Sequence, residues 1–151
     1  MLTTYVMSYA PGPRSQPVRR PMRLLLVDDE PAVLRGLRRV IGQRRPQWEL
    51  HCEIGGAPAL ARLATTHFDC LMTDLQMPNM SGVTLLGLVR ARHPACVRLV
   101  HSSQIETTGR DRVAALCHRM LDKPATPQEV ITTLDWAEQL AVHVDLTGTN
   151  P

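Results

Sequence analysis

Four polar segments of this chain combine residue types that could bind a metal ion and a phosphate group. Each follows an apolar run: Asp28, Asp29 and Glu30 follow the first, Asp74 the third, Ser102 and Ser103 the fourth, and Lys123 with Pro124 the fifth. Carboxylates and hydroxyls offer oxygen ligands to a hard cation, and a lysine offers donors to an anion. Their joint use depends on whether the fold brings them to one place.

The carboxylates point to a metal site. Like charges held close together disfavour ionisation, so a cluster of Asp28, Asp29 and Asp74 needs a cation beside it. Mg²⁺ prefers oxygen ligands and suits a few carboxylates plus a phosphate. Taken alone, the acidic run 28–30 could mark a helix N-terminus, and Asp74 could be an ordinary turn residue. Their joint appearance at two strand ends favours the Mg²⁺ site.

Lys123 is the only lysine among 17 basic residues, and all the others are arginines. Arginine therefore serves wherever a surface charge suffices. A compact ammonium fits a small pocket that the planar guanidinium does not. We treat Lys123 as a candidate site residue, with chance as the alternative.

Apolar runs of strand length alternate with helical patterns along the chain. We predict strands at 22–28, 48–54, 68–74, 96–102 and 119–122, and helices at 31–44, 57–67, 82–93, 107–117 and 127–143, of which 107–117 has the weakest pattern. This alternation predicts an α/β fold with a doubly wound, five-stranded parallel sheet flanked by helices on both faces. Ligands of such sheets bind at the carboxyl ends of the strands, where the polar segments lie.

The length of 151 residues suits one domain. Residues 1–21 are rich in Pro, Ser, Gly and Arg and lack any period, so we predict a disordered leader. The domain itself is expected at 22–143, followed by a flexible tail at 144–151. The chain shows no secretory signal and no apolar run of about 18 residues, which predicts a cytoplasmic protein without a membrane span.

Charge and cysteine spacing exclude two further classes. Four arginines lie in the first 23 residues without an acid to balance them, and the remaining residues carry 13 basic and 14 acidic side chains. The body is close to neutral and lacks the overall basic character of a nucleic-acid binder. The four cysteines are widely spaced, which argues against a zinc site and favours small core residues.

The polar segments and their surroundings, taken together, resemble the receiver domains of bacterial two-component response regulators. The likeness is carried by LLLVDDEP (24–31), DCLMTDLQMPNMSG (69–82), VRLVHSS (97–103) and LDKP (121–124), in the order and spacing of that family, and runs from about Arg23 to Gln139. The stretches WELHCEIGG and RARHPACVRLVHSS further resemble receivers joined to HDOD-type output domains.

The resemblance implies a flavodoxin-like receiver fold and a phosphorylation switch. Asp74 would accept a phosphoryl group from a histidine kinase or a phosphotransfer protein, in a reaction that depends on Mg²⁺. Asp28, Asp29 and Asp74, with the backbone carbonyl of Gln76, would hold the ion, and Asp29 would be the more direct ligand than Asp28. The chain's own enzymology would be limited to autophosphorylation and autodephosphorylation.

The resemblance also assigns roles to the fourth and fifth polar segments. Ser102 would hydrogen-bond the phosphoryl group and Lys123 would pair with it. Both could move toward phosphorylated Asp74 and pull on residues 103–120. We therefore expect the signal to leave through protein–protein contacts of residues 103–120 and the last helix, with no nucleic acid or membrane as partner.

Some positions depart from the family pattern and keep alternatives open. Met120 stands where the family usually has Tyr or Phe, which leaves a phosphorylation-independent binding module as the alternative function. A phosphatase of related fold would need a second acid two residues after the nucleophile, where this chain has Gln76. His101 is unusual before Ser102, and strand alternation predicts that it lies on the surface or behind the site.

Arginines make the outer side of the first predicted helix basic. They are Arg35, Arg38 and Arg39, with Arg44 and Arg45 at its end. A solvated helix face explains them, and the sharper alternative is a docking surface for an acidic partner.

Overall fold

The fold is known from a computed structural model that describes residues 20–147, with side chains described up to residue 144. Residues 1–19 of the predicted leader and 148–151 of the predicted tail lie outside the described residues. Within residues 20–147, no helix combines the length and the hydrophobicity that crossing a membrane requires.

The strands form one parallel sheet in the order β2-β1-β3-β4-β5. Their bounds are β1 Arg23–Asp28, β2 Glu49–Ile54, β3 Cys70–Thr73, β4 Val97–Ser102 and β5 Arg119–Asp122. The helices are α1 Pro31–Arg44, α2 Gly56–Leu63, α3 Gly82–Arg92, α4 Ile105–Thr108, α5 Arg110–Ala114 and α6 Pro127–Thr147. The predicted doubly wound α/β fold is confirmed.

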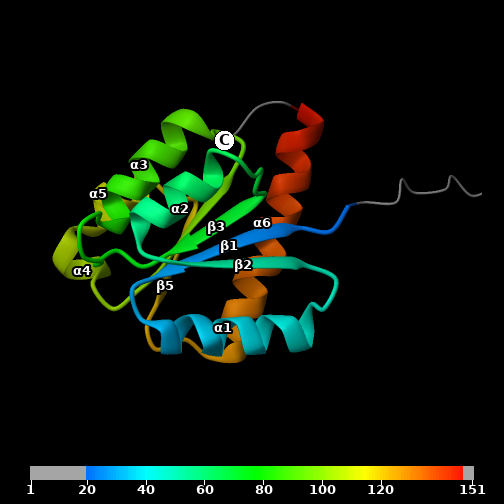
Figure 1. Ribbon diagram of the computed structural model, residues 1–151, viewed down its shortest axis with the longest axis horizontal. Coiled ribbons are helices and arrows are strands. Elements are labelled where there is room, and N and C mark those ends of the chain that lie inside the picture. Colours follow the sequence, from blue (N-terminus) through cyan, green and yellow to red (C-terminus); the bar gives the residue numbers. More distant parts are fainter. Residues whose placement is uncertain (1–19, 148–151) are drawn as a thin grey trace, which may run out of the picture.

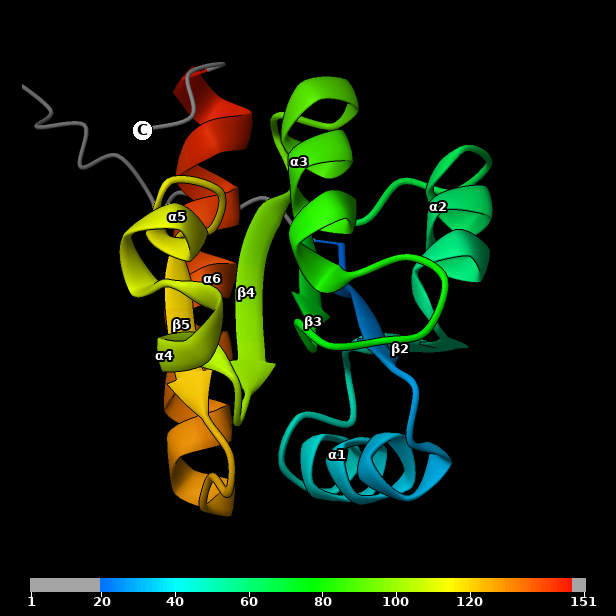
Figure 2. The same cartoon turned by 90° about the vertical axis from the view of Figure 1, so that its left-hand side faces the viewer.

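Helices cover both faces of the sheet, with α1 on one side and α2 and α3 on the other (Figures 1 and 2). One buried cluster joins the sheet to α1 and α6, and a second joins it to α2, α3 and the α4–α5 segment. The central strands β1, β3 and β4 are almost wholly buried because both of their faces are covered. Cys70 and Cys96 lie in this core, and burial raises the pKa of the Cys96 thiol to about 12.

Three helices differ from their predictions. The helix predicted at 57–67 ends four residues earlier, at Leu63 of α2. The weak helix predicted at 107–117 is two short helices, because Gly109 between α4 and α5 adopts a φ of 94°, outside the helical region. The last helix, predicted to end at 143, runs four residues further to Thr147. Its continuation keeps Val144 in the core at 4% exposure, on the face that buries Ala137 and Ala141.

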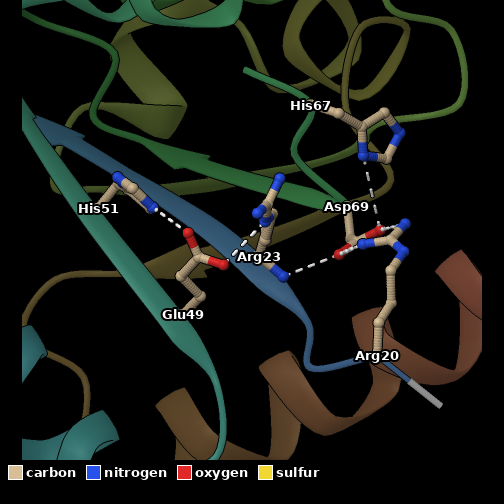
Figure 3. A network of polar contacts seen from close by, with 6 residues as sticks. All are labelled: Arg20, Arg23, Glu49, His51, His67 and Asp69. Atoms are coloured by element: carbon tan, nitrogen blue, oxygen red, sulfur yellow. Dashed lines mark hydrogen bonds and ion pairs between the residues drawn. The ribbon is translucent and has the colours of Figure 1, made fainter. Parts of the chain in front are cut away.

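The amino edge of the sheet is held by an ion-pair network (Figure 3). Asp69 accepts two hydrogen bonds from the Arg20 guanidinium, at 2.7 and 2.9 Å, and one from the Arg23 backbone amide at 2.7 Å. Glu49 of β2 accepts a hydrogen bond from Arg23 Nε at 2.8 Å and lies 2.9 Å from His51 Nε2. Arg20 was predicted to belong to the leader, yet it packs against the body of the domain.

Candidate functional site

The carboxyl edge of the sheet brings the predicted acidic residues together. In the sheet, β2 lies on one side of β1 and β3 lies on the other, so the strand order reverses between β1 and β3. Asp28 ends β1, Asp29 follows it, and Asp74 follows β3. One carboxylate oxygen from each of the three lies within 4.8 Å of the others.

Lys123 completes this cluster from the end of β5. Its Nζ lies 2.7 Å from Asp28 Oδ2 and 3.1 Å from Asp74 Oδ2. Partial burial lowers the pKa of Lys123, but the hydrogen bond to Asp28 and the charge of Asp74 outweigh it, so the net pKa is raised. The ammonium therefore stays charged at neutral pH and offsets part of the negative charge of the two carboxylates.

Backbone amides fix the two buried carboxylates. Asp28 Oδ1 accepts a hydrogen bond from the Glu30 amide at 2.9 Å, and Asp74 Oδ1 accepts one from the Leu75 amide at 2.6 Å. In each aspartate the other carboxylate oxygen, Oδ2, accepts a hydrogen bond from the Lys123 ammonium. The local chain thus orients both carboxylates before any ligand binds.

Gly82, which sequence reasoning did not single out, sets the position of the Asp74 backbone. A Cβ at residue 82 would lie 1.8 Å from the Asp74 carbonyl oxygen and 2.8 Å from Leu75 Cα. The Gly82 backbone amide donates a hydrogen bond to the Leu75 carbonyl oxygen, at 2.8 Å. The preceding Ser81 caps α3 by accepting a hydrogen bond from the Thr84 amide. A serine cap followed by glycine was the available sequence signal for this close approach.

Ser102 lies at the carboxyl end of β4, and Gln76 lies in the loop that follows β3, as we predicted from the sequence. Ser102 ends β4, is fully buried, and its hydroxyl accepts a hydrogen bond from the Gln104 amide at 3.2 Å. Gln76 follows Asp74 by two residues in the loop before α3, and its side chain is exposed. The roles of the Ser102 hydroxyl and the Gln76 carbonyl remain predictions.

His101 is not the surface residue that we considered. Its exposure is 8%, and it lies at the wall of a groove that also includes Lys123. Burial, followed by the charge of Lys123, lowers the pKa of His101. Alternation along β4 predicted its direction away from the site but could not show that α1 and α6 enclose that side. Met120 is half-buried against the opposite core cluster.

The donor set fits Mg²⁺. All three candidate side-chain ligands are carboxylates, which hard divalent cations prefer over nitrogen or sulfur ligands. A single neighbouring ammonium leaves the cluster of three carboxylates net negative, so a further cation is favoured there.

A parallel five-stranded sheet with an acidic cluster and a lysine at its switch point defines a class of α/β signalling domains. The family model of the response regulator receiver domain matches residues 24–135. The chain belongs to this family.

Curated relatives share this domain as one part of longer proteins. The transcriptional regulatory protein PrrA of Mycobacterium leprae is 37% identical over 97 residues, which are 62% of this chain and 39% of PrrA. A protein-glutamate methylesterase/protein-glutamine glutaminase of Cereibacter sphaeroides is 31% identical over 112 residues, which are 72% of this chain and 30% of that protein. This chain therefore spans about a third of the relatives' length.

Solved structures agree with the fold. The signal receiver domain of an HD domain-containing protein from Pseudomonas fluorescens has a TM-score of 0.76 at 26% identity, covering 83% of this chain and 99% of that chain. This likeness fits the resemblance to receivers of HDOD-type proteins. The response regulator TrrA of Thermotoga maritima, solved with Mg(2+)-BeF, has a TM-score of 0.70 at 20% identity, covering 77% and 98%.

Proposed function

We propose that this receiver domain accepts a phosphoryl group on Asp74 in a Mg²⁺-dependent reaction and signals through protein–protein contacts. The proposal rests on the cluster of Asp28, Asp29 and Asp74, in which one carboxylate oxygen of each residue lies within 4.8 Å of the others. Lys123 forms ion pairs with Asp28 and Asp74. The donor would be a histidine kinase or a phosphotransfer protein. Beyond this transfer and the loss of the group to water, we propose no enzymatic activity of this domain.

Asp74 is the proposed nucleophile. One of its carboxylate oxygens forms the new bond to phosphorus while the bond between phosphorus and the donor's histidine nitrogen breaks, and the nitrogen keeps the electron pair. Asp74 Oδ1 is held by the Leu75 amide, which leaves Oδ2 beside Lys123 as the attacking atom.

Asp28 and Asp29 are the proposed Mg²⁺ ligands, together with Asp74 and the carbonyl of Gln76. When bound, Mg²⁺ would offset the negative charge of the carboxylates and of the phosphoryl oxygens. Asp29 is more exposed than Asp28, and Lys123 pairs with Asp28 and Asp74, which supports Asp29 as the more direct ligand.

Lys123 and Ser102 are the proposed partners of the phosphoryl group. The Lys123 ammonium, which pairs with Asp28 and Asp74, would pair with the phosphoryl oxygens, and bound Mg²⁺ would supply positive charge to the carboxylates. The Ser102 hydroxyl accepts its hydrogen bond from the Gln104 amide, so its own proton would be available to donate to the same group.

The segment that follows these two residues is the proposed output surface. Residues 103–120 contain two helices of one turn or slightly more, separated by Gly109. Arg110 joins them by an ion pair to Glu106 at 2.7 Å and lies 3.9 Å from Asp122, next to Lys123. Ile105 and Val113 anchor the segment in the core, but its helices are short and Gly109 interrupts them, which suits a segment that shifts between two states. Residues 103–120 and the face of α6 would then contact the downstream protein.

A mass-spectrometric labelling experiment tests the acceptor. With acetyl phosphate and Mg²⁺, we expect one added phosphoryl group in the wild type and none in Asp74→Asn. The label should be stable in acid and lost in base, as acyl phosphates are. Equal labelling of both proteins would refute the assignment to Asp74.

Met120 favours one second candidate, a binding module that does not depend on phosphorylation. The family's usual aromatic ring at this position is absent, and a flexible methionine replaces it. Hydrogen exchange with and without beryllofluoride separates the two functions. Protection changes that reach residues 103–120 support the switch, whereas changes confined to the acidic cluster support the binding module.

A further inference from the structure

Strand β2 is an edge of the sheet: β1 pairs with it on one side, and no strand among residues 20–147 pairs with it on the other. It runs across the front of the domain in Figure 1, between α1 and α2. The Glu49 and Gly55 amides donate to carbonyl oxygens on the β1 side. Backbone direction alternates along a strand, so the amides and carbonyls of Leu50, Cys52 and Ile54 point outward. These groups can pair with a further strand.

Charged side chains usually protect such an edge from pairing. The charges of β2 are instead paired within the domain. Glu49 lies 2.8 Å from Arg23 Nε and 2.9 Å from His51 Nε2 (Figure 3), and Glu53 lies 2.7 Å from Arg62 of α2. Little net charge therefore opposes a strand that approaches this edge.

The side chains of β2 divide between the two faces of the sheet. Leu50 and Cys52 pack against the core cluster that includes α1, and alternation places Ile54 on the same face. His51 lies on the opposite face, where its ring contacts Phe68 at 5.1 Å between centroids. Ile54 is 57% exposed and is the one exposed large hydrophobic side chain in the described part of the chain. A strand paired with β2 would cover it.

A second copy of β2 complements the first when the two run antiparallel with Cys52 at the centre. In this register Leu50 stands opposite Ile54 of the second copy, and His51 stands opposite Glu53 of the second copy. Backbone hydrogen bonds join the residues that point outward, and the residues between them bring their side chains close. Apolar side chains thus meet apolar ones, and an imidazole meets a carboxylate, which are favourable cross-strand pairs.

We propose that this chain forms a two-fold dimer through antiparallel pairing of its β2 strands, centred on Cys52, so that one sheet continues through both copies. The interface is self-complementary, as a two-fold dimer requires. It lies outside the acidic cluster and residues 103–120, and it does not rest on phosphorylation of Asp74.

Arg38 is the charge that opposes this dimer. It lies on α1 beside Cys52, so the Arg38 side chains of both copies would lie on the same face of the joined sheet. Its side chain is exposed and can extend into solvent, which limits the repulsion. Arg38→Gln should therefore strengthen the dimer, by about two- to fivefold.

The Cys52 thiol gives a direct readout of the register. Opposite residues of a hydrogen-bonded antiparallel pair have Cα atoms about 5.5 Å apart, which suits a disulfide. Diamide takes one proton and one electron from each thiol and is itself reduced as the S–S bond forms. We expect diamide to convert the full chain to a covalent dimer whose disulfide mass spectrometry places at Cys52. Cys52→Ser should give no covalent dimer, and Cys70 and Cys96 are buried.

Sedimentation velocity measures the non-covalent dimer of the full chain, in reducing buffer without Mg²⁺ or a phosphodonor and at concentrations up to about 1 mM. We expect Ile54→Lys to weaken the dimer about tenfold, because each dimer loses two cross-strand pairs. Gln139→Lys adds the same charge at an exposed position of α6 and should leave the dimer unchanged. Amide hydrogen exchange at residues 50, 52 and 54 should slow as the protein concentration rises.

A charge exchange tests which residues stand opposite each other. His51→Glu places two carboxylates opposite each other, and Glu53→Arg places a guanidinium opposite an imidazole, so each variant alone should dimerise less than the wild type. A mixture of the two variants restores opposite charges and should form heterodimers in preference to either homodimer.

Four outcomes would overturn the proposal. The first is a chain that stays monomeric at every concentration, including one whose β2 amides become protected only when another protein is added. The second is an equal effect of Ile54→Lys and Gln139→Lys on the dimer. The third is a diamide-induced dimer that persists in Cys52→Ser, and the fourth is concentration-dependent amide protection at positions other than 50, 52 and 54.

Discussion

The ammonium of Lys123 lies closer to Asp28, at 2.7 Å, than to the proposed acceptor Asp74, at 3.1 Å. Asp28 is 2% exposed, so this ion pair keeps a buried carboxylate from standing alone. We therefore propose two tasks for Lys123: it would stabilise the domain in the absence of Mg²⁺, and it would pair with the phosphoryl group when Mg²⁺ offsets the charge of the carboxylates.

This relationship predicts a stability loss that Mg²⁺ repairs. We expect Lys123→Met to lower the free energy of unfolding by roughly 2 kcal/mol in a chelator, because a buried carboxylate loses its partner. Mg²⁺ should stabilise the variant more than the wild type. Urea denaturation of both proteins, with and without Mg²⁺, measures the difference. A loss that is the same in both conditions would mean that the cation and Lys123 do not share the carboxylates.

The two adjacent aspartates should differ in their contribution to metal affinity. Asp29→Ala is expected to weaken Mg²⁺ binding more than Asp28→Ala. The Asp28 carboxylate already accepts hydrogen bonds from the Glu30 amide and from Lys123. Calorimetric titration of each variant is the measurement. Glu30→Ala is the matched control and should change affinity by no more than about twofold, as expected for an exposed charge screened by solvent. A larger effect in Asp28→Ala would reverse the two roles.

Gly82 and Gly87, both in α3, should respond to alanine in opposite directions. Gly82→Ala places a Cβ against the Asp74 carbonyl, so we expect a destabilisation of about 1–3 kcal/mol and slower phosphorylation by acetyl phosphate. Gly87 has open space around it, and Gly87→Ala should stabilise by about 0.5–1 kcal/mol through helix propensity. Thermal denaturation and labelling rates check both. Equal effects of the two substitutions would contradict the close approach of α3 to Asp74.

His101 should make the domain less stable as the pH falls. Burial and the charge of Lys123 lower its folded-state pKa, although Asp28 and Asp74 oppose this. The unfolded chain therefore binds the proton at a higher pH than the folded chain does. Stability is complete above the ordinary imidazole pKa of about 6.5 and declines as the pH falls toward the lowered value. His101→Leu should flatten this part of the pH profile in urea denaturation. A variant profile parallel to that of the wild type would show that His101 does not contribute.

The boundary between leader and domain should lie at Arg20. Removal of residues 1–19 is expected to leave the melting temperature unchanged, since these residues have no apolar period. Arg20→Ala should cost about 1 kcal/mol or less, because half of that side chain is exposed to solvent. Asp69→Ala should cost more, since the Arg23 amide also loses its acceptor. A fall of several degrees on removing residues 1–19 alone would show that the leader packs on the domain.

The sequence by itself determined the fold class and the membership of the acidic cluster. Both follow from local information, because apolar runs and helical periods mark the elements and parallel strands carry their ends to one edge of the sheet. The carboxyl ends of β1, β3, β4 and β5 thus place Asp28, Asp74, Ser102 and Lys123 without any coordinates. The short strand Arg119–Asp122 was found at its predicted bounds for the same reason.

Only the tertiary structure decided how these residues are held and what surrounds them. Lys123 lies nearer to Asp28 than to Asp74, and Arg20 forms an ion pair with Asp69; both contacts join residues distant in sequence. The close approach of Gly82 to the Asp74 carbonyl depends on backbone packing. The enclosure of His101 and the extra turn of α6 are set by neighbouring elements as well. Local patterns report which face of an element is apolar, but contact distances and burial depend on how separate elements pack.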